Sequence, residues 1–110
     1  MTTGVLTVAV TVDSEAAGRE LAALAVERRL AACAQVSSPI TSVYRWEGRV
    51  HQDPEWLVTF KTTEARYPEL EGALREAHSY DVPEILATPV VDGNDDYLRW
   101  VAEETSPEGS

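Results

Sequence analysis

The sequence has very few of the residues that build disulfides, membrane spans or aromatic-rich cores. Its 110 residues include one cysteine, one phenylalanine and one methionine, so no disulfide can form within the chain. A single thiol is typical of proteins from reducing compartments, and we expect a cytoplasmic location. No apolar run approaches the roughly 20 residues that a membrane-spanning helix needs, and no basic stretch near the N-terminus indicates a signal peptide. We therefore expect no membrane partner.

Basic residues are also scarce. Nine Lys and Arg face nineteen Asp and Glu, which gives a formal net charge of −10. Phosphate backbones are bound by clustered Lys and Arg, so this balance argues against a nucleic-acid partner. An acidic surface suits a cation-binding protein, but it also simply aids solubility. Both interpretations stay open on composition alone.

The length predicts one domain over residues 1–110, with a core over about residues 5–104. A chain of this size buries a sufficient core without disulfides or metal. The 44% of hydrophobic residues and 25% of charged residues are ordinary for a globular protein.

Two β-rich segments, 41–51 and 56–62, dominate the pattern. They contain Tyr44 and Trp46 and flank a Glu47-Gly48 pair, where glycine supplies the backbone freedom of a tight turn. We predict a long hairpin with its tip at this pair. A hairpin of this length and aromatic content either covers a helix layer or reaches into a partner subunit.

The remaining patterns alternate between strand and helix. Small and branched residues predict a central strand over 5–12, and Ser37 to Pro39 predict a bend in the second strand. Three helices are expected: one over 15–29, one over 64–77 that is regular only from about Pro68, and one that begins at Asn94. A further strand is expected over 84–91, and a frayed tail over 106–110. Tyr97, Leu98, Trp100 and Val101 are expected to pack the third helix inward. The order βαββαβα predicts an α+β, ferredoxin-like sandwich, an antiparallel sheet with helices on one face.

Two segments carry residues with chemical potential. Cys33 is either a soft-metal ligand, a nucleophile, or a small buried apolar residue among alanines. A hydrolytic pair with His78 is conceivable, but no third orienting residue or Gly-rich oxyanion loop accompanies it. We therefore expect no enzymatic activity.

The segment 78–84 crowds four polar side chains into one loop, namely His78, Tyr80, Asp81 and Glu84. Imidazole and carboxylates bind divalent cations, yet the same residues also build structured turns. Lys61 ends a predicted strand, where it could meet an anion or, more simply, pair with Glu84 or Asp81. The residues alone leave these alternatives open.

Taken together, five segments resemble the CutA divalent-cation tolerance family over about residues 5–104. These are Arg29-Leu-Ala-Ala-Cys-Ala34, Thr41-Ser-Val-Tyr-Arg-Trp-Glu-Gly48, Phe60-Lys-Thr-Thr63, His78-Ser-Tyr-Asp-Val-Pro-Glu-Ile85 and Asn94 through Trp100. Departures also occur: Val10 stands where some bacterial members have a further cysteine, and Ser79 replaces a usual proline.

The resemblance implies a ferredoxin-like subunit in a tight homotrimer similar to the PII signalling proteins. It implies weak binding of copper(II) or another divalent cation, with no organic cofactor. It also implies metal ligands at His78, Cys33 and Glu84, and cleft or ligand-binding residues at Lys61, Tyr80, Asp81, Tyr44 and Trp46. The alternative function is a PII-like scaffold or regulator that takes a small molecule or an unidentified protein partner in clefts between subunits.

Overall fold

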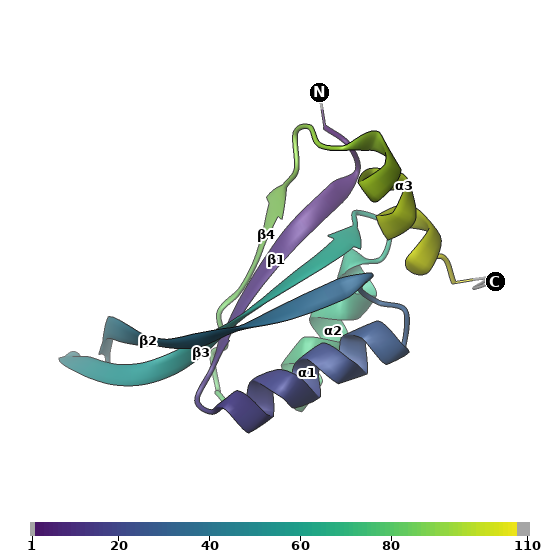
Figure 1. Ribbon diagram of the computed structural model, residues 1–110. Coiled ribbons are helices and arrows are strands. Elements are labelled where there is room, and N and C mark those ends of the chain that lie inside the picture. Colours follow the sequence, from purple (N-terminus) through teal and green to yellow (C-terminus); the bar gives the residue numbers. More distant parts are fainter. Residues whose placement is uncertain (1, 108–110) are drawn as a thin grey trace.

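The computed structural model describes residues 2–107 and has the expected order of elements (Figure 1). They are β1 (Val5–Val12), α1 (Glu15–Glu27), β2 (Cys33–Trp46), β3 (Arg49–Thr63), α2 (Tyr67–Ala77), β4 (Ile85–Pro89) and α3 (Asp95–Glu104). The four strands form one antiparallel sheet in the order β2-β3-β1-β4. This confirms the predicted α+β architecture. Of the frayed tail, residues 108–110 lie outside the described part of the chain.

The core lies between the sheet and two helices. Alternate residues of β1, among them Val8 and Val10, are fully buried beside Val58 and Phe60 of β3. Leucines of α1 and α2 close the core from the helix side, namely Leu21, Leu70 and Leu74. Period-two burial along β1 and period-four burial along α2 are the patterns of a sheet covered by helices on one face. No helix within residues 2–107 is long and apolar enough to cross a membrane.

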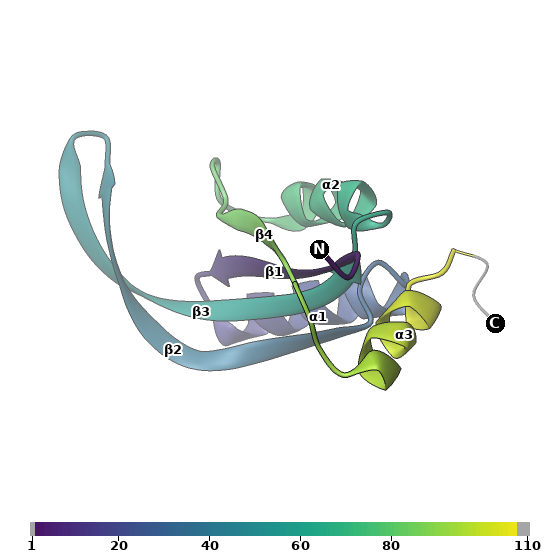
Figure 2. The same cartoon turned by 90° about the horizontal axis from the view of Figure 1, so that it is seen from above.

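Helix α3 departs from the expectation that all helices share one face. Its Val101 packs with Val5 and Ala32 in a separate, smaller cluster. Val5 belongs to the set of β1 side chains that alternates with Val8 and Val10, so α3 lies on the opposite side of the sheet from α1. Figures 1 and 2 show it at one end of that side.

The inward packing expected for α3 is only partly right. Val101 is buried and Leu98 is half-buried, but Tyr97 and Trp100 stay about two-fifths exposed, at 41% and 39%. A ten-residue helix at a sheet end has only a narrow contact stripe. Its two aromatic rings lie outside that stripe, against each other, with centroids 5.5 Å apart.

Helix α1 ends two residues earlier than predicted, at Glu27. Arg29 adopts a left-handed backbone with φ of 59°, a conformation that stops a helix. Its guanidinium then donates to the backbone carbonyls of Glu103 and Ser106 at 2.9 and 3.1 Å. The arginine therefore joins the end of α1 to the end of α3 instead of extending α1.

The hairpin is much longer than the sheet that holds it. Strands β2 and β3 have 14 and 15 residues, against 8 in β1 and 5 in β4. β1 pairs with β3 only as far as Trp56, so the outer half of the hairpin is a two-stranded ribbon (Figure 2). Pro54 lies in this ribbon, where β3 has a free edge that does not require its missing N–H.

The predicted turn and bend are confirmed. Glu47 and Gly48 both have positive φ, 51° and 77°, which matches the tight turns that join twisted antiparallel strands. The register between β2 and β3 shifts between Val36 and Pro39. Helix α2 begins at Tyr67, close to the proline that was expected to start its regular part.

A close approach of α1 to the sheet gives a test of this packing. A Cβ atom on Gly18 would lie 3.2–3.3 Å from methyl groups of Val36, Val58 and Val12. We expect Gly18→Val to lower the free energy of unfolding by about 2 kcal/mol through overpacking. Urea denaturation at fixed protein concentration measures this.

The matched control is Gly72→Ala on α2. A Cβ atom there meets nothing within 4 Å, so alanine should stabilise the helix by roughly 0.5–1 kcal/mol. A Gly18→Val protein as stable as the parent would show that α1 does not sit this close to the sheet.

Candidate functional site

An acidic, aromatic cleft lies where the outer hairpin meets the loop after α2. Its volume is about 740 Å³. Its lining comes from the end of β1, both strands of the hairpin and the loop before β4; the residues are Thr11, Asp13, Ser42, Val43, Tyr44, Trp46, Asp53, Pro54, Glu55, Tyr80, Asp81, Val82 and Glu84. Five of these are carboxylates and none is basic. The low-dielectric walls of such a cleft concentrate a negative potential.

Two phenols hold two of the carboxylates in place. Tyr80 donates its hydroxyl to Glu55 at 2.8 Å, and Tyr44 donates to Asp53 at 2.6 Å. Burial, reinforced by the hydrogen bond to Glu55, raises the pKa of Tyr80 well above that of an ordinary tyrosine. The hydrogen bond to Asp53 likewise raises the pKa of Tyr44. Both phenols therefore act as fixed donors.

His78 positions the loop that carries Tyr80. Its Nδ1 accepts the backbone N–H of Tyr80 at 3.1 Å, while Nε2 lies 2.8 Å from the carbonyl oxygen of Thr11. Because that carbonyl can only accept, the ring carries its proton on Nε2. The imidazole also packs against the Tyr80 ring, with centroids 4.6 Å apart. Both ring nitrogens are thus engaged in holding the loop to β1.

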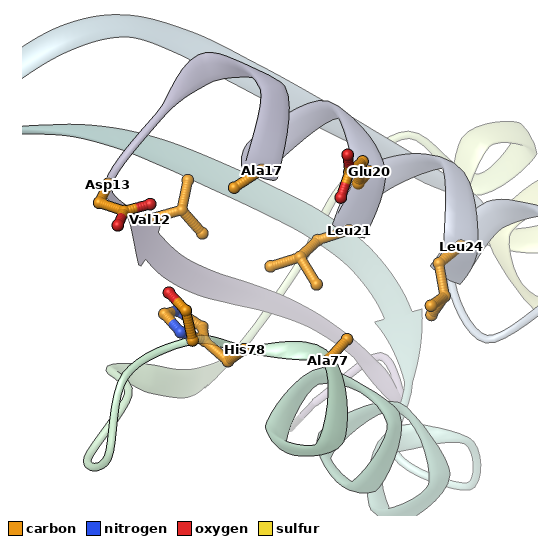
Figure 3. Close-up of a pocket in the computed structure, with 9 residues that line it drawn as sticks. Val12, Asp13, Ala17, Glu20, Leu21, Leu24, Ala77 and His78 are labelled. Atoms are coloured by element: carbon orange, nitrogen blue, oxygen red, sulfur yellow. The ribbon is translucent and has the colours of Figure 1, made fainter.

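A smaller hollow of about 330 Å³ adjoins this loop, between α1 and the end of α2. Figure 3 shows Asp13 and His78 at one end of it and Leu24 at the other. Leu21 of α1 faces this space, so its floor is largely apolar. Asp13 lines both the hollow and the cleft, and it is the carboxylate that the two share.

Cys33 and Lys61 lie together, but at the other end of the sheet. They are directly paired across β2 and β3. The Cys33 sulfur lies 3.3 Å from the hydroxyl oxygen of Tyr97, and Lys61 donates to the side-chain oxygen of Gln35 at 3.1 Å. The ion pair expected between Lys61 and Glu84 or Asp81 is therefore not formed. The hydrogen bond with Cys33 raises the pKa of Tyr97 to about 12.

The structure divides the predicted site residues into two groups. Tyr44, Trp46, Tyr80, Asp81 and Glu84 line the cleft, with His78 directly behind its loop. Cys33 and Lys61 do not reach it.

The register of the sheet gives the scale of the separation. Lys61 pairs with Thr7, whereas His78 binds Thr11, and four residues of strand span about 13 Å. Cys33, a further strand away, cannot form a hydrolytic pair with His78 in one subunit. Within residues 2–107, no three His, Cys, Asp or Glu side chains are placed to hold one metal ion.

Sequence reasoning missed three carboxylates of the cleft. Asp13 directly precedes α1, whose N-cap is Ser14, which accepts the backbone N–H of Ala17. Asp53 and Glu55 flank Pro54 in β3. Alternation along β3 places both on one face of the hairpin, which is a signal that could have found them.

Comparisons with known proteins agree on one family. The family described as CutA1 divalent ion tolerance protein matches residues 6–104. The "Divalent-cation tolerance protein CutA" of Thermus thermophilus is 45% identical over 98 residues, covering 89% of this chain and 95% of that protein. The human "Protein CutA" is 42% identical over 96 residues, covering 87% of this chain but 54% of the human protein.

Solved structures show the same fold. The Cut A1 protein of Thermus thermophilus superposes with a TM-score of 0.90 at 43% identity, covering 93% of this chain and 99% of that one. CutA1 from Oryza sativa gives 0.91 at 40% identity, covering 96% of each chain. None of these names describes an enzymatic activity.

The phenols of the site predict how stability depends on pH. Each of the four tyrosines has a pKa raised in the folded protein, whereas in the unfolded chain they titrate near pH 10. As the pH rises, the unfolded state therefore loses these protons before the folded state does. The free energy of unfolding should be at its full value below about pH 10 and should fall as the pH rises further.

Urea midpoints measured between about pH 9 and about pH 11 test this. Tyr80→Phe should flatten the decline more than Tyr44→Phe, because the Tyr80 hydroxyl is the more buried of the two. Equal slopes in the parent and the Tyr80→Phe protein would contradict the half-buried hydrogen bond from Tyr80 to Glu55.

Proposed function

The chain belongs to the CutA1 divalent ion tolerance family, and from this premise we propose that it is a divalent-cation tolerance protein whose acidic cleft binds divalent metal ions weakly. The observation that supports this is the lining of the cleft, five carboxylates with no basic side chain among them. Opposite charge at this density raises the local concentration of cations.

The arrangement of the carboxylates favours weak binding. Asp53 and Glu55 already accept hydrogen bonds from tyrosines, which leaves Asp13, Asp81 and Glu84 for an ion. These three do not form a closed ligand set within the described residues. An ion held by one or two carboxylates keeps most of its water, as magnesium does in many proteins.

Copper(II) would find few of its preferred ligands in one subunit. Imidazole and thiolate bind copper better than carboxylates do. The ring nitrogens of His78 are both hydrogen-bonded, and Cys33 lies at the far end of the sheet. Of the three ligands predicted from the resemblance, only Glu84 lines the cleft. The three would share one ion only if different subunits supplied them.

Removal of single carboxylates tests the cleft. We expect Glu84→Gln and Asp81→Asn each to weaken the binding of Mn²⁺ or Cu²⁺ by about tenfold, which corresponds to roughly 1.4 kcal/mol. Isothermal titration calorimetry measures this. The matched control is Glu76→Gln, which removes an exposed carboxylate of α2 outside the cleft.

The proposal fails if both cleft variants bind ions as the parent does. Binding lost in His78→Ala but kept in Glu84→Gln would instead point to the histidine as the ligand. A thermal shift with small metabolites but none with metal ions would favour the alternative, a PII-like regulator.

We also propose that the protein is a homotrimer without catalytic activity, in the cytoplasm. The surface of the single chain supports an assembly. Its accessible area is 6894 Å², roughly 900 Å² more than the about 6,000 Å² typical of a monomer of its mass. Its radius of gyration, 14.6 Å, likewise exceeds the about 13 Å of a spherical domain of this length.

Native mass spectrometry tests the assembly. We expect a species of three chains, each of 12.1 kDa, that persists at micromolar concentration because the outer hairpin needs a neighbour to cover it. A monomeric mass under these conditions would contradict the homotrimer.

A further inference from the structure

We propose that the hollow between α1 and α2 binds a small organic ammonium ion with an apolar chain. The chain lies along the apolar side of α1, and the ammonium group pairs with Asp13 and Glu20. The inference goes beyond the proposed function, because Glu20 lines the hollow but not the acidic cleft and the binding needs no metal ion.

The size of the hollow suits a small molecule. Its volume is about 330 Å³, at the lower end of the roughly 300–1,000 Å³ found for ligand pockets. It lies between the two helices that cover the core (Figure 3), on the side of the sheet opposite α3. A molecule of a few heavy atoms fits there, whereas a folded segment of a protein partner does not.

One side of α1 supplies an apolar floor. Ala17, Leu21 and Leu24 recur at spacings of four and three, which places them on one side of the helix. Leu21 is buried, and the other two are half-buried. From Ala17 to Leu24 the helix rises by about 10 Å, and an extended n-hexyl chain is slightly shorter than this. The floor therefore suits a linear apolar chain.

Two carboxylates give the hollow a charge of one sign. Asp13 and Glu20 line it and are exposed, and no ion pair within residues 2–107 uses either of them. None of the described residues that line the hollow is a lysine or an arginine. Arg19, which precedes Glu20, pairs with Glu15 at 2.7 Å. The hollow therefore favours a cation over an anion or a neutral molecule.

The ends of two helices also meet here, with opposite partial charges. The C-terminus of α2 at Ala77 carries a partial negative charge, which adds to that of the carboxylates. The positive end of α1 is offset, because Ser14 accepts the backbone N–H of Ala17 at 3.0 Å and Glu15 lies in the first turn. Both ring nitrogens of His78 are already hydrogen-bonded. The balance stays negative.

An organic cation uses the whole lining, whereas a bare metal ion uses little of it. Leucine and alanine side chains offer no ligand atoms, and no three His, Cys, Asp or Glu side chains within residues 2–107 are placed around one ion. An alkyl chain leaves water against the leucines, and an ammonium group has three donors for carboxylates. Figure 3 shows Asp13 at one end and Leu24 at the other, so the ligand is a monoamine.

Titration with n-hexylammonium tests the site. Amide NMR spectra of the isotope-labelled full chain, recorded with EDTA, should show saturable shifts at Ala17, Leu24 and Ala77. We expect a Kd of about 1 mM, as befits so few heavy atoms. n-Hexanol and hexanoate have the same chain without the positive charge, and methylammonium has the charge without the chain. Each should bind about fivefold more weakly or not at all.

A charge variant tests the role of Glu20. Glu20→Gln should weaken the binding of n-hexylammonium by about threefold, the size of effect expected for an exposed ion pair, and should leave that of n-hexanol unchanged. The matched control is Glu27→Gln, the same change at an exposed carboxylate of α1 outside the hollow. It should bind as the parent does.

A filled hollow tests the role of the space. Ala77→Leu places a larger side chain at the last residue of α2, which lines the hollow, and should abolish the saturable shifts. Ala23→Leu is the matched control, on an exposed position of α1 outside the hollow. Leucine is a strong helix former, so both variants should fold, which thermal unfolding checks.

The outcomes separate this site from the acidic cleft. No saturation up to about ten times the expected Kd, or equal binding of n-hexanol, overturns the inference. Shifts that map to the hairpin and survive both Glu20→Gln and Ala77→Leu put the amine in the cleft and overturn it as well. Because EDTA removes divalent ions, a cleft that fails to bind metal overturns the proposed function and leaves this site standing.

Discussion

The length of the β2–β3 hairpin is the constraint on which the rest of this structure depends. Only its inner half pairs with β1 and shares the core of Val8, Val10 and Phe60. Its outer half is a two-stranded ribbon, a structure that is marginal in water without a further layer. The cleft and the exposed apolar side chains of the hairpin follow from this unequal strand length.

The cleft exists because the ribbon projects past the end of β1, toward the loop after α2. There a phenol from each side holds a carboxylate, and His78 ties the loop to the carbonyl of Thr11. These hydrogen bonds fix the positions of carboxylates along the cleft, but they do not bring three ligands together around one metal ion. A site of this kind suits weak, exchangeable binding of cations, which fits the family to which the chain belongs.

The two ends of the molecule have different chemistry. One end has the carboxylates and the basic hairpin tip, and the other has the single thiol against Tyr97, with α3 beside it. Because the two ends lie too far apart to meet within one chain, any chemistry that combines them needs more than one copy of the chain. The family resemblance grouped Cys33 with His78, and one subunit keeps them apart.

By itself, the sequence determined what is local. The turn at Glu47-Gly48, the bend before Pro39 and the order βαββαβα all depend on the conformational preferences of neighbouring residues, and each was predicted correctly. Only the tertiary structure decided which side chains meet. Strand register and the path of the loop after α2 brought Asp13, Glu55 and Tyr80 together from three separate segments, and no spacing along the chain encodes those long-range contacts.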